Sequence, residues 1–246
     1  KGLGNQFLDD LREADAFIHI VDASGKTDIL GKQTEDHDPC EDVKFLEEEL
    51  DAWYCNILSR VWKGFIRKAE LENQKFSEAV AKQFSGLKVK KEQVKKVLLK
   101  LTLPEKPSIW SEEQLKKFAS ELRKISKPMI IAANKCDDES AVKNIENLKN
   151  NFKDYLIIPC SADSELALRQ AAKSGLIEYV SGEKDFKILR NLNDKQKMAL
   201  ENIKKNVLEK FEFGTGVQQV LNTAIFDLLK YIAIFPGSPN KLKDSK

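Results

Sequence analysis

The sequence predicts an α/β fold with a doubly wound, mostly parallel sheet and a large helical insertion. Two short apolar runs of strand length, 129–133 and 155–158, flank a helical pattern over 139–151. This strand, helix, strand order is typical of a parallel sheet. A third apolar run, 17–21, precedes the first of these strands by about 100 residues, whereas a crossover connection needs only about a dozen. The excess predicts helices inserted between the two strands.

The predicted insertion has two parts of opposite charge. Residues 35–51 hold nine acidic residues and one lysine, a net charge of −8, and we assign them to the solvated face of a helix with its acids near the N-terminus. Residues 61–104 hold eleven basic and four acidic residues, a net charge of +7. Two helices, 62–84 and 91–101, are expected there, with a hinge at 85–86.

The remaining elements follow from periodicity and capping. Ser111 and Gln114 form a capping-box pattern that opens a helix. The core face of the last helix is expected to comprise Val217, Val220, Leu221, Ala224, Ile225, Leu228 and Leu229. Helices are predicted over 5–14, 111–125, 139–151, 163–172, 194–210 and from 214, and 176–193 is predicted to be irregular.

Composition excludes several classes of protein. The 246 residues are 41% hydrophobic and carry a net charge of +2, and they contain no apolar run of about 18 residues, so no membrane span is expected. The first residues are amphipathic and acidic, unlike a signal peptide. Four cysteines without metal-ligand spacing predict reduced thiols in a cytoplasmic protein. His19 is interpreted as a core residue rather than a ligand.

The strand at 129–133 leads directly into Asn134, Lys135 and Asp137. Open α/β sheets bind ligands at the carboxyl ends of their strands. An Asp carboxylate can accept two hydrogen bonds from the ring N–H and the amine of guanine, donors that adenine lacks on that edge. The Lys stem can cover the base and the Asn amide can brace the loop. The alternative is a structural turn with a helix N-cap at Asp137 or Asp138.

A second polar turn supports the guanine pocket. Cys160, Ser161 and Ala162 follow the strand at 155–158, and Ser161 lies 24 residues after Asp137. Backbone N–H groups of Ser161 and Ala162 are predicted to meet the guanine carbonyl oxygen. Cys136 and Cys160 are interpreted as small thiols that fill the two loops, with a redox pair as the alternative.

The lysine-rich stretch 86–100, with a net charge of +5, is a candidate for non-specific RNA contact. The alternative is a solvated basic helix face. The candidate residues are Lys88, Lys90, Lys91, Lys95 and Lys96.

Phosphate-loop motifs are not found in the chain. No Gly-x4-Gly-Lys-Ser/Thr pattern occurs in the 246 residues. The segment 22–25, Asp-Ala-Ser-Gly, resembles a Mg²⁺-water loop, but too few residues precede it for a strand, phosphate loop, helix and switch. Gly214-Thr-Gly216 lacks a following Lys and is interpreted as a helix cap.

Several motifs together resemble the Obg-like GTPases of the YchF type, closest to the archaeal branch, over nearly the whole chain. They are Gly2-Leu-Gly-Asn-Gln-Phe-Leu-Asp-Asp-Leu-Arg12, Val21-Asp-Ala-Ser-Gly25, Asn134-Lys-Cys-Asp137, Pro159-Cys-Ser-Ala162 and Gly214-Thr-Gly-Val-Gln218. The resemblance implies part of a P-loop GTPase with a helical, partly coiled-coil insertion. The implied division is 1–38 G-domain part, 39–110 insertion arm, 111–232 G-domain remainder and 233–246 the start of a TGS-like domain.

The resemblance also implies a function. The complete protein would hydrolyse GTP as a switch associated with the ribosome or RNA, with phosphate, Mg²⁺ and water held by residues that precede this chain. The chain alone is then expected to be inactive. Some relatives prefer ATP, but the intact Asn-Lys-Cys-Asp motif favours GTP. The alternative is a non-enzymatic helical module that binds RNA or protein through its basic arm.

Overall fold

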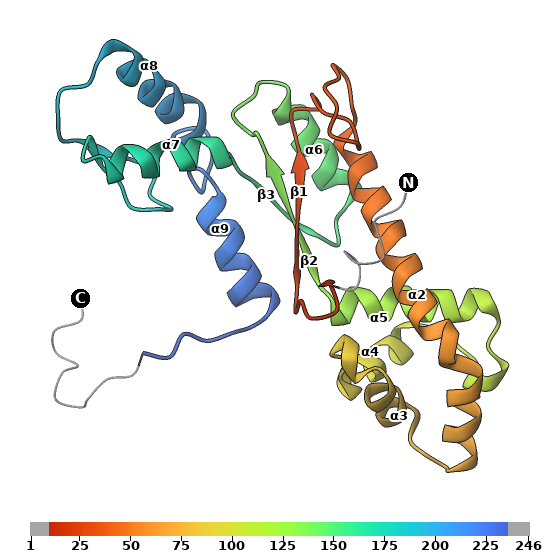
Figure 1. Cartoon of the computed structure of the whole chain (residues 1–246). Coiled ribbons are helices and arrows are strands. Elements are labelled where there is room, and N and C mark those ends of the chain that lie inside the picture. The colour runs from red at the N-terminus through yellow and green to blue at the C-terminus, as the bar shows by residue number, and fades with distance from the viewer. Residues whose placement is uncertain (1–9, 236–246) are drawn as a thin grey trace, which may run out of the picture.

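The computed structural model describes residues 10–235 and contains a three-stranded parallel sheet. Its strands are β1 (Phe17–Asp22), β2 (Met129–Asn134) and β3 (Leu156–Pro159), in that order across the sheet (Figure 1). The three strands predicted from apolar runs are confirmed. Because the strands are parallel, their carboxyl ends meet at one edge, with Asp22 in register with Asn134.

Helices cover both faces of this sheet, as expected for a doubly wound fold. The first half of α2 (Pro39–Leu71) and α6 (Ala141–Asn151) pack on one face, and α9 (Val217–Asn222) packs on the other (Figure 1). Alternate residues of the buried strand β2 serve the two cores, Ile131 and Ala133 on the first face and Ile130 and Ala132 on the second.

The insertion is helical and breaks near the predicted hinge at 85–86, between α3 and α4, but it also has a break that was not predicted. α2 runs unbroken for 33 residues and ends at Leu71, and a turn at 72–75 leads into α3 (Phe76–Gln83). The predicted single helix over 62–84 is therefore wrong, because Asn73 adopts a left-handed φ of 48° that ends α2. α4 (Lys91–Lys100) matches its prediction within one residue, and α5 (Glu112–Ser126) begins with the predicted capping box.

Aromatic side chains hold the insertion together. Trp62 of α2 stacks on Trp110 at a centroid distance of 5.5 Å, and both rings contact Phe76 and Phe118. α2 packs mainly on α5, and the other helices of the insertion are short, α3 with 8 residues and α4 with 10. The implied coiled coil is therefore not confirmed, since the packing is that of a compact bundle, and the implied domain boundaries stay a prediction.

A small lobe follows β3. It comprises α7 (Ala162–Lys173), a hairpin of β4 (Ile177–Glu178) with β5 (Lys187–Ile188), and α8 (Asp194–Ile203). The hairpin lies in the stretch predicted to be irregular, and strands of two residues leave too short a pattern to detect. π-Helical turns at Lys204–Leu208 and Thr223–Leu228 continue α8 and α9.

The predictions for the last helix and for the first helix remain to be compared with the structure. Leu221 and Ile225 were expected on the core face of the last helix, but they are 42% and 40% exposed. Val220 and Ala224 are the residues that pack on the sheet, and Leu221 and Ile225, each one residue further along, lie beside this face. Most of the helix predicted over 5–14 lies outside the described residues. Among residues 10–235, no helix has the length and apolarity needed to cross a membrane.

Candidate functional site

Two loops meet at the carboxyl edge of the sheet, and backbone hydrogen bonds join them. The first loop comprises residues 134–140 and the second comprises residues 159–162. The Cys136 N–H donates to the Cys160 carbonyl oxygen at 3.1 Å, and the Cys160 N–H donates to the Ala133 carbonyl oxygen at 2.9 Å. The loops predicted to converge are therefore adjacent in the fold.

Asn134 ties the first loop to the second through its side chain. Its Oδ1 accepts a hydrogen bond from the Ala162 backbone N–H at 3.0 Å. The N–H of Ser161 donates to the Thr215 carbonyl oxygen at 2.9 Å, and the Ser161 side chain caps α7. The predicted contact of the Ser161 amide with a base is therefore not available in this conformation. Ala162 offers its N–H to a ligand only when the Asn134 amide gives it up.

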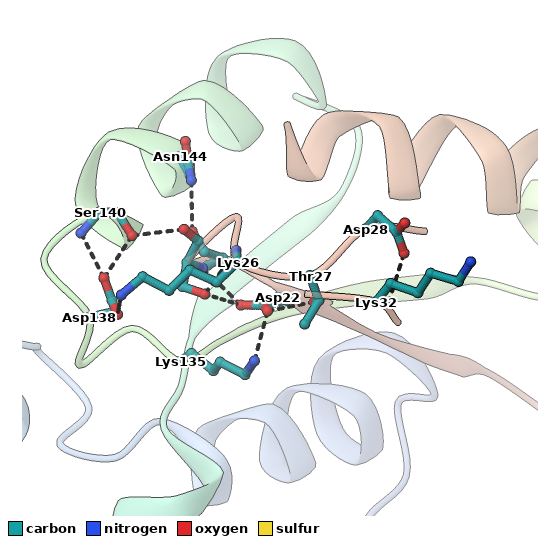
Figure 2. A network of polar contacts seen from close by, with 11 residues as sticks. Asp22, Lys26, Thr27, Asp28, Lys32, Lys135, Asp138, Ser140 and Asn144 are labelled. Atoms are coloured by element: carbon teal, nitrogen blue, oxygen red, sulfur yellow. Dashed lines mark hydrogen bonds and ion pairs between the residues drawn. The ribbon is translucent and has the colours of Figure 1, made fainter. Parts of the chain in front are cut away.

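Lys135 leaves the strand with a left-handed backbone, at a φ of 60°. Non-glycine residues seldom adopt this region. The Lys135 Nζ forms an ion pair with Asp22 Oδ2 at 2.7 Å, and the Lys135 side chain is 45% exposed (Figure 2). The Lys stem therefore lies along the surface between the ends of β1 and β2.

The two neighbouring aspartates have different surroundings. The carboxylate of Asp138 pairs with Lys26 and accepts from the Ser140 N–H and hydroxyl, and these contacts lower the pKa of Asp138 to about 2. Asp137 is exposed, and its carboxylate makes no hydrogen bond or ion pair with any residue between 10 and 235. The N-cap of α6 is Ser140, so the alternative prediction of an N-cap at Asp137 or Asp138 is wrong. Asp138 instead holds the turn before α6, and Asp137 is left free for a ligand.

The two cysteines of the loops are buried and free. Burial raises the pKa of the Cys136 thiol and that of the Cys160 thiol to about 12 each. Both side chains therefore stay protonated at physiological pH and fill space beneath the loops. This agrees with the prediction that they are packing residues. The predicted contact of Cys160 with a base stays a prediction.

The buried carboxylate of Glu165, which the sequence analysis did not single out, supports the second loop through Thr215. Glu165 is 4% exposed and accepts from the Thr215 hydroxyl at 2.6 Å, the Tyr179 hydroxyl at 2.8 Å and the Arg169 guanidinium at 2.6 Å. Burial alone would raise the pKa of Glu165, but these donors outweigh it and lower the pKa. Arg169 lies one turn further along α7, but Thr215 and Tyr179 come from segments outside this helix, so the sequence pattern did not mark Glu165 as a buried acceptor.

This network predicts a pH dependence of stability. Because the pKa of Glu165 in the folded protein lies below its usual value of 4.5, Glu165 stabilises the fold fully above that value. The stabilisation is lost as the pH falls through the lowered pKa. We expect Glu165→Gln to cost about 1–3 kcal/mol at pH 7, and the difference from wild type to shrink between pH 5 and the acid limit of folding. Denaturant titrations over this pH range measure it.

The exposed Glu178 of β4 provides the matched control for that comparison. Glu178→Gln should leave the free energy of unfolding nearly unchanged at every pH. A constant difference between Glu165→Gln and wild type down to acid pH would contradict the lowered pKa.

A cleft opens beside Lys135. It has a volume of about 750 Å³ and is lined by Lys26, Thr27, Gln33, Thr34, Glu35 and Lys135. A hollow of similar size lies far away between the end of α2 and residues 105–109. Within the part of the chain that the structure describes, no group of three His, Cys, Asp or Glu side chains is placed to hold a metal ion.

The lysines proposed for RNA contact divide into two sets. Lys88 is held by Asp15 at 3.0 Å and by the Glu13 carbonyl oxygen, and Lys91 lies 4.0 Å from Glu78. Lys90, Lys95 and Lys96 are exposed and form no ion pair with any residue that the structure describes. Only this second set is free to meet a polyanion without breaking a contact.

The parallel sheet brings an Asn-Lys-x-Asp loop and a Ser-Ala turn to neighbouring strand ends, the edge at which open α/β domains bind their ligands. The family model described as "Obg-like GTPase YGR210-like, G4 motif-containing domain" matches residues 132–238. The chain is therefore similar to the Obg-like GTPases.

Similarity to known proteins extends over the whole chain. A GTP-binding protein of Methanocaldococcus jannaschii is 48% identical over 100% of this chain and 62% of its own length. The ribosome-binding ATPase YchF of Bacillus subtilis is 32% identical over 68% of this chain and 45% of its own length. The crystal structure of a GTP-binding protein from Pyrococcus horikoshii superposes with a TM-score of 0.77 at 44% identity, covering 96% of this chain and 64% of that one. The chain thus spans about three fifths of the archaeal relatives it matches.

Proposed function

We propose that this chain supplies the base-recognition part of a GTP-binding domain. The observation that carries the proposal is the free carboxylate of Asp137, exposed beside Asn134 and Lys135, which are both held by neighbouring residues. An exposed carboxylate on a rigid loop is ready to accept two hydrogen bonds from one ligand edge.

In this proposal each loop residue has a separate task. The Asp137 carboxylate accepts from the ring N–H and the exocyclic amine of guanine, and the stem of Lys135 covers one face of the base. The Ala162 N–H reaches the guanine carbonyl oxygen once the Asn134 side chain shifts from its 3.0 Å contact. Adenine presents no donor pair to Asp137, so binding it would leave the carboxylate desolvated and unpaired.

The proposal distinguishes GTP from ATP, although one relative is named an ATPase. In a competition titration with the product of the complete reading frame, GDP should displace a fluorescent guanine nucleotide and ADP should not. Equal displacement by the two diphosphates would overturn the assignment to guanine.

Hydrolysis also belongs to the proposal. Phosphate binding and Mg²⁺ coordination need a Gly-rich loop and a hydroxyl ligand, and the 246 residues contain no such motif. We therefore assign these tasks to a separate segment, with GTP hydrolysis acting as a switch in the assembled protein and with this chain inactive as a hydrolase by itself.

A second proposed role is contact with ribosomal RNA through α4. It is supported by the exposed Lys90, Lys95 and Lys96, and by the relative whose name states that it binds the ribosome. Clustered lysines neutralise phosphates and release counterions, so binding should weaken steeply with salt.

The test of this role removes two of the free charges. Lys95→Ala combined with Lys96→Ala should weaken ribosomal RNA binding and reduce the log–log salt slope by about 2. Filter binding over a salt series measures both quantities. Lys116→Ala with Lys117→Ala, on the exposed face of α5, is the control and should leave the slope unchanged. No RNA binding by wild type, or a flat salt response, would count against α4 as the surface.

A further inference from the structure

The end of β1 holds the first loop and the start of α6 through four contacts that involve side chains (Figure 2). All of them come from residues 22–28, which we name the clasp. Its backbone carbonyls accept from the Ser140 hydroxyl at 2.7 Å and from the Asn144 side-chain amide at 2.9 Å. Its side chains form two ion pairs, Lys26 with Asp138 and Asp22 with Lys135. The pairs run in opposite directions, so each segment contributes one cation and one anion.

Hydrogen bonds from its own turn hold the Asp22 carboxylate in place, in addition to its ion pair with Lys135. The Ser24 N–H and hydroxyl donate to its Oδ1 at 3.0 and 2.6 Å, and the Thr27 hydroxyl donates to its Oδ2 at 2.6 Å. Its side chain is 11% exposed. Burial alone would raise the pKa of Asp22, but the donors, Lys135 foremost, lower it. Asp22 is therefore a charged acceptor that is aimed at Lys135 and stays ionised.

Lys135 has few other restraints. Its side chain is 45% exposed, and among the described residues Asp22 is its ion-pair partner. Its left-handed backbone directs the stem away from the strand, and the cleft of about 750 Å³ lies beside it. Without Asp22 the long side chain would sample many rotamers in that open space.

We propose that the clasp sets the geometry of base recognition and that Asp22 is the positioning residue that holds the Lys135 stem over the purine. Asp22 itself touches no ligand. This inference rests on the proposed function, because it assumes that the first loop binds a base.

The test is a double-mutant cycle with the product of the complete reading frame and fluorescent GDP. Asp22→Ala should weaken GDP binding about fivefold in the wild-type background, the effect expected of one partly exposed ion pair. In a Lys135→Met background the same change should have almost no effect, because its consequence passes through Lys135. A purely structural role would instead weaken binding equally in both backgrounds, and that result overturns the inference.

Two variants keep this test interpretable. Asp28→Asn is the matched control: Asp28 lies at the end of the clasp, and its carboxylate accepts from the N–H groups of Leu30 and Lys32 in its own turn. It should leave GDP affinity unchanged. Asp22→Asn keeps an acceptor oxygen for Ser24, and its amide can donate to the Thr27 hydroxyl oxygen. It replaces Asp22→Ala if that variant does not fold, and it should then give a smaller loss of GDP affinity.

The outcomes also separate the inference from the proposed function. Wild-type binding of GDP but not ADP, together with no loss in Asp22→Ala or Asp22→Asn, overturns the role of Asp22 and leaves the base pocket standing. Failure of wild type to prefer GDP overturns both.

Discussion

Replacing Asp137 with asparagine is expected to reverse the base preference of the complete protein from guanine to xanthine nucleotides. The carboxylate accepts two hydrogen bonds in the proposed complex, and an amide can accept only one of them. Xanthine carries a carbonyl where guanine carries its amine, so the Asn amide can donate to it. GTP affinity should fall roughly 100-fold, the effect of losing a charge-assisted pair, while xanthosine triphosphate should bind more tightly than it does to wild type.

Competition between the two triphosphates measures this ratio, and the chain offers a matched control. Asp163 lies one residue beyond Ala162 and is also exposed. Asp163→Asn removes a carboxylate near the second loop without touching the first, and it should leave the ratio unchanged. A ratio that is the same in Asp137→Asn and wild type would show that the Asp137 carboxylate does not meet the base.

Gly216→Ala should produce the largest loss of stability. Gly216 precedes α9 with a φ of 73°, and a Cβ added there would lie 2.0 Å from the Pro159 carbonyl oxygen. The close approach is between two backbones, so no flexible side chain can relieve it. Strain in the left-handed region and the clash together should cost roughly 2–4 kcal/mol. Thermal unfolding should show a melting temperature lower by roughly 5–15 °C.

Gly31 separates the two contributions to this loss. It has nearly the same φ, 74°, but no atom lies within 4 Å of its added Cβ. Gly31→Ala should therefore show the backbone strain alone, about 1 kcal/mol. If both variants lost the same free energy of unfolding, the close approach of Gly216 to Pro159 would add nothing to the backbone strain.

The sequence predicted the parts of the site that follow from strand ends. The three strands are apolar runs, and the loops after β2 and β3 had to lie side by side because parallel neighbours end at one edge. The pattern placed a helix N-cap at Asp137 or Asp138, whereas the N-cap of α6 is Ser140. It also left open which of the two aspartates stays free. The structure separates them by their contacts, since Lys26 comes from more than a hundred residues earlier in the chain.

The residues that support the two loops could not be predicted, because their partners lie far away in the sequence. Glu165, Thr215 and Asp22 each act through residues from other elements, and no spacing rule connects them. The interpretation of 214–216 as a helix cap was incomplete for the same reason. Gly216 does precede α9, but Thr215 also accepts from Ser161, so this turn braces the second loop. The break after α2 was missed because a left-handed Asn leaves a weaker signal than the Ser-Gly pair at 85–86.

The most direct test of the account is a crystal structure of the product of the complete reading frame with bound GDP. The account predicts both carboxylate oxygens of Asp137 within hydrogen-bond distance of the guanine ring nitrogen and amine, about 3 Å, with the Lys135 stem over the base and its Nζ still paired with Asp22. A base bound elsewhere, with Asp137 facing solvent in the complex, would contradict it.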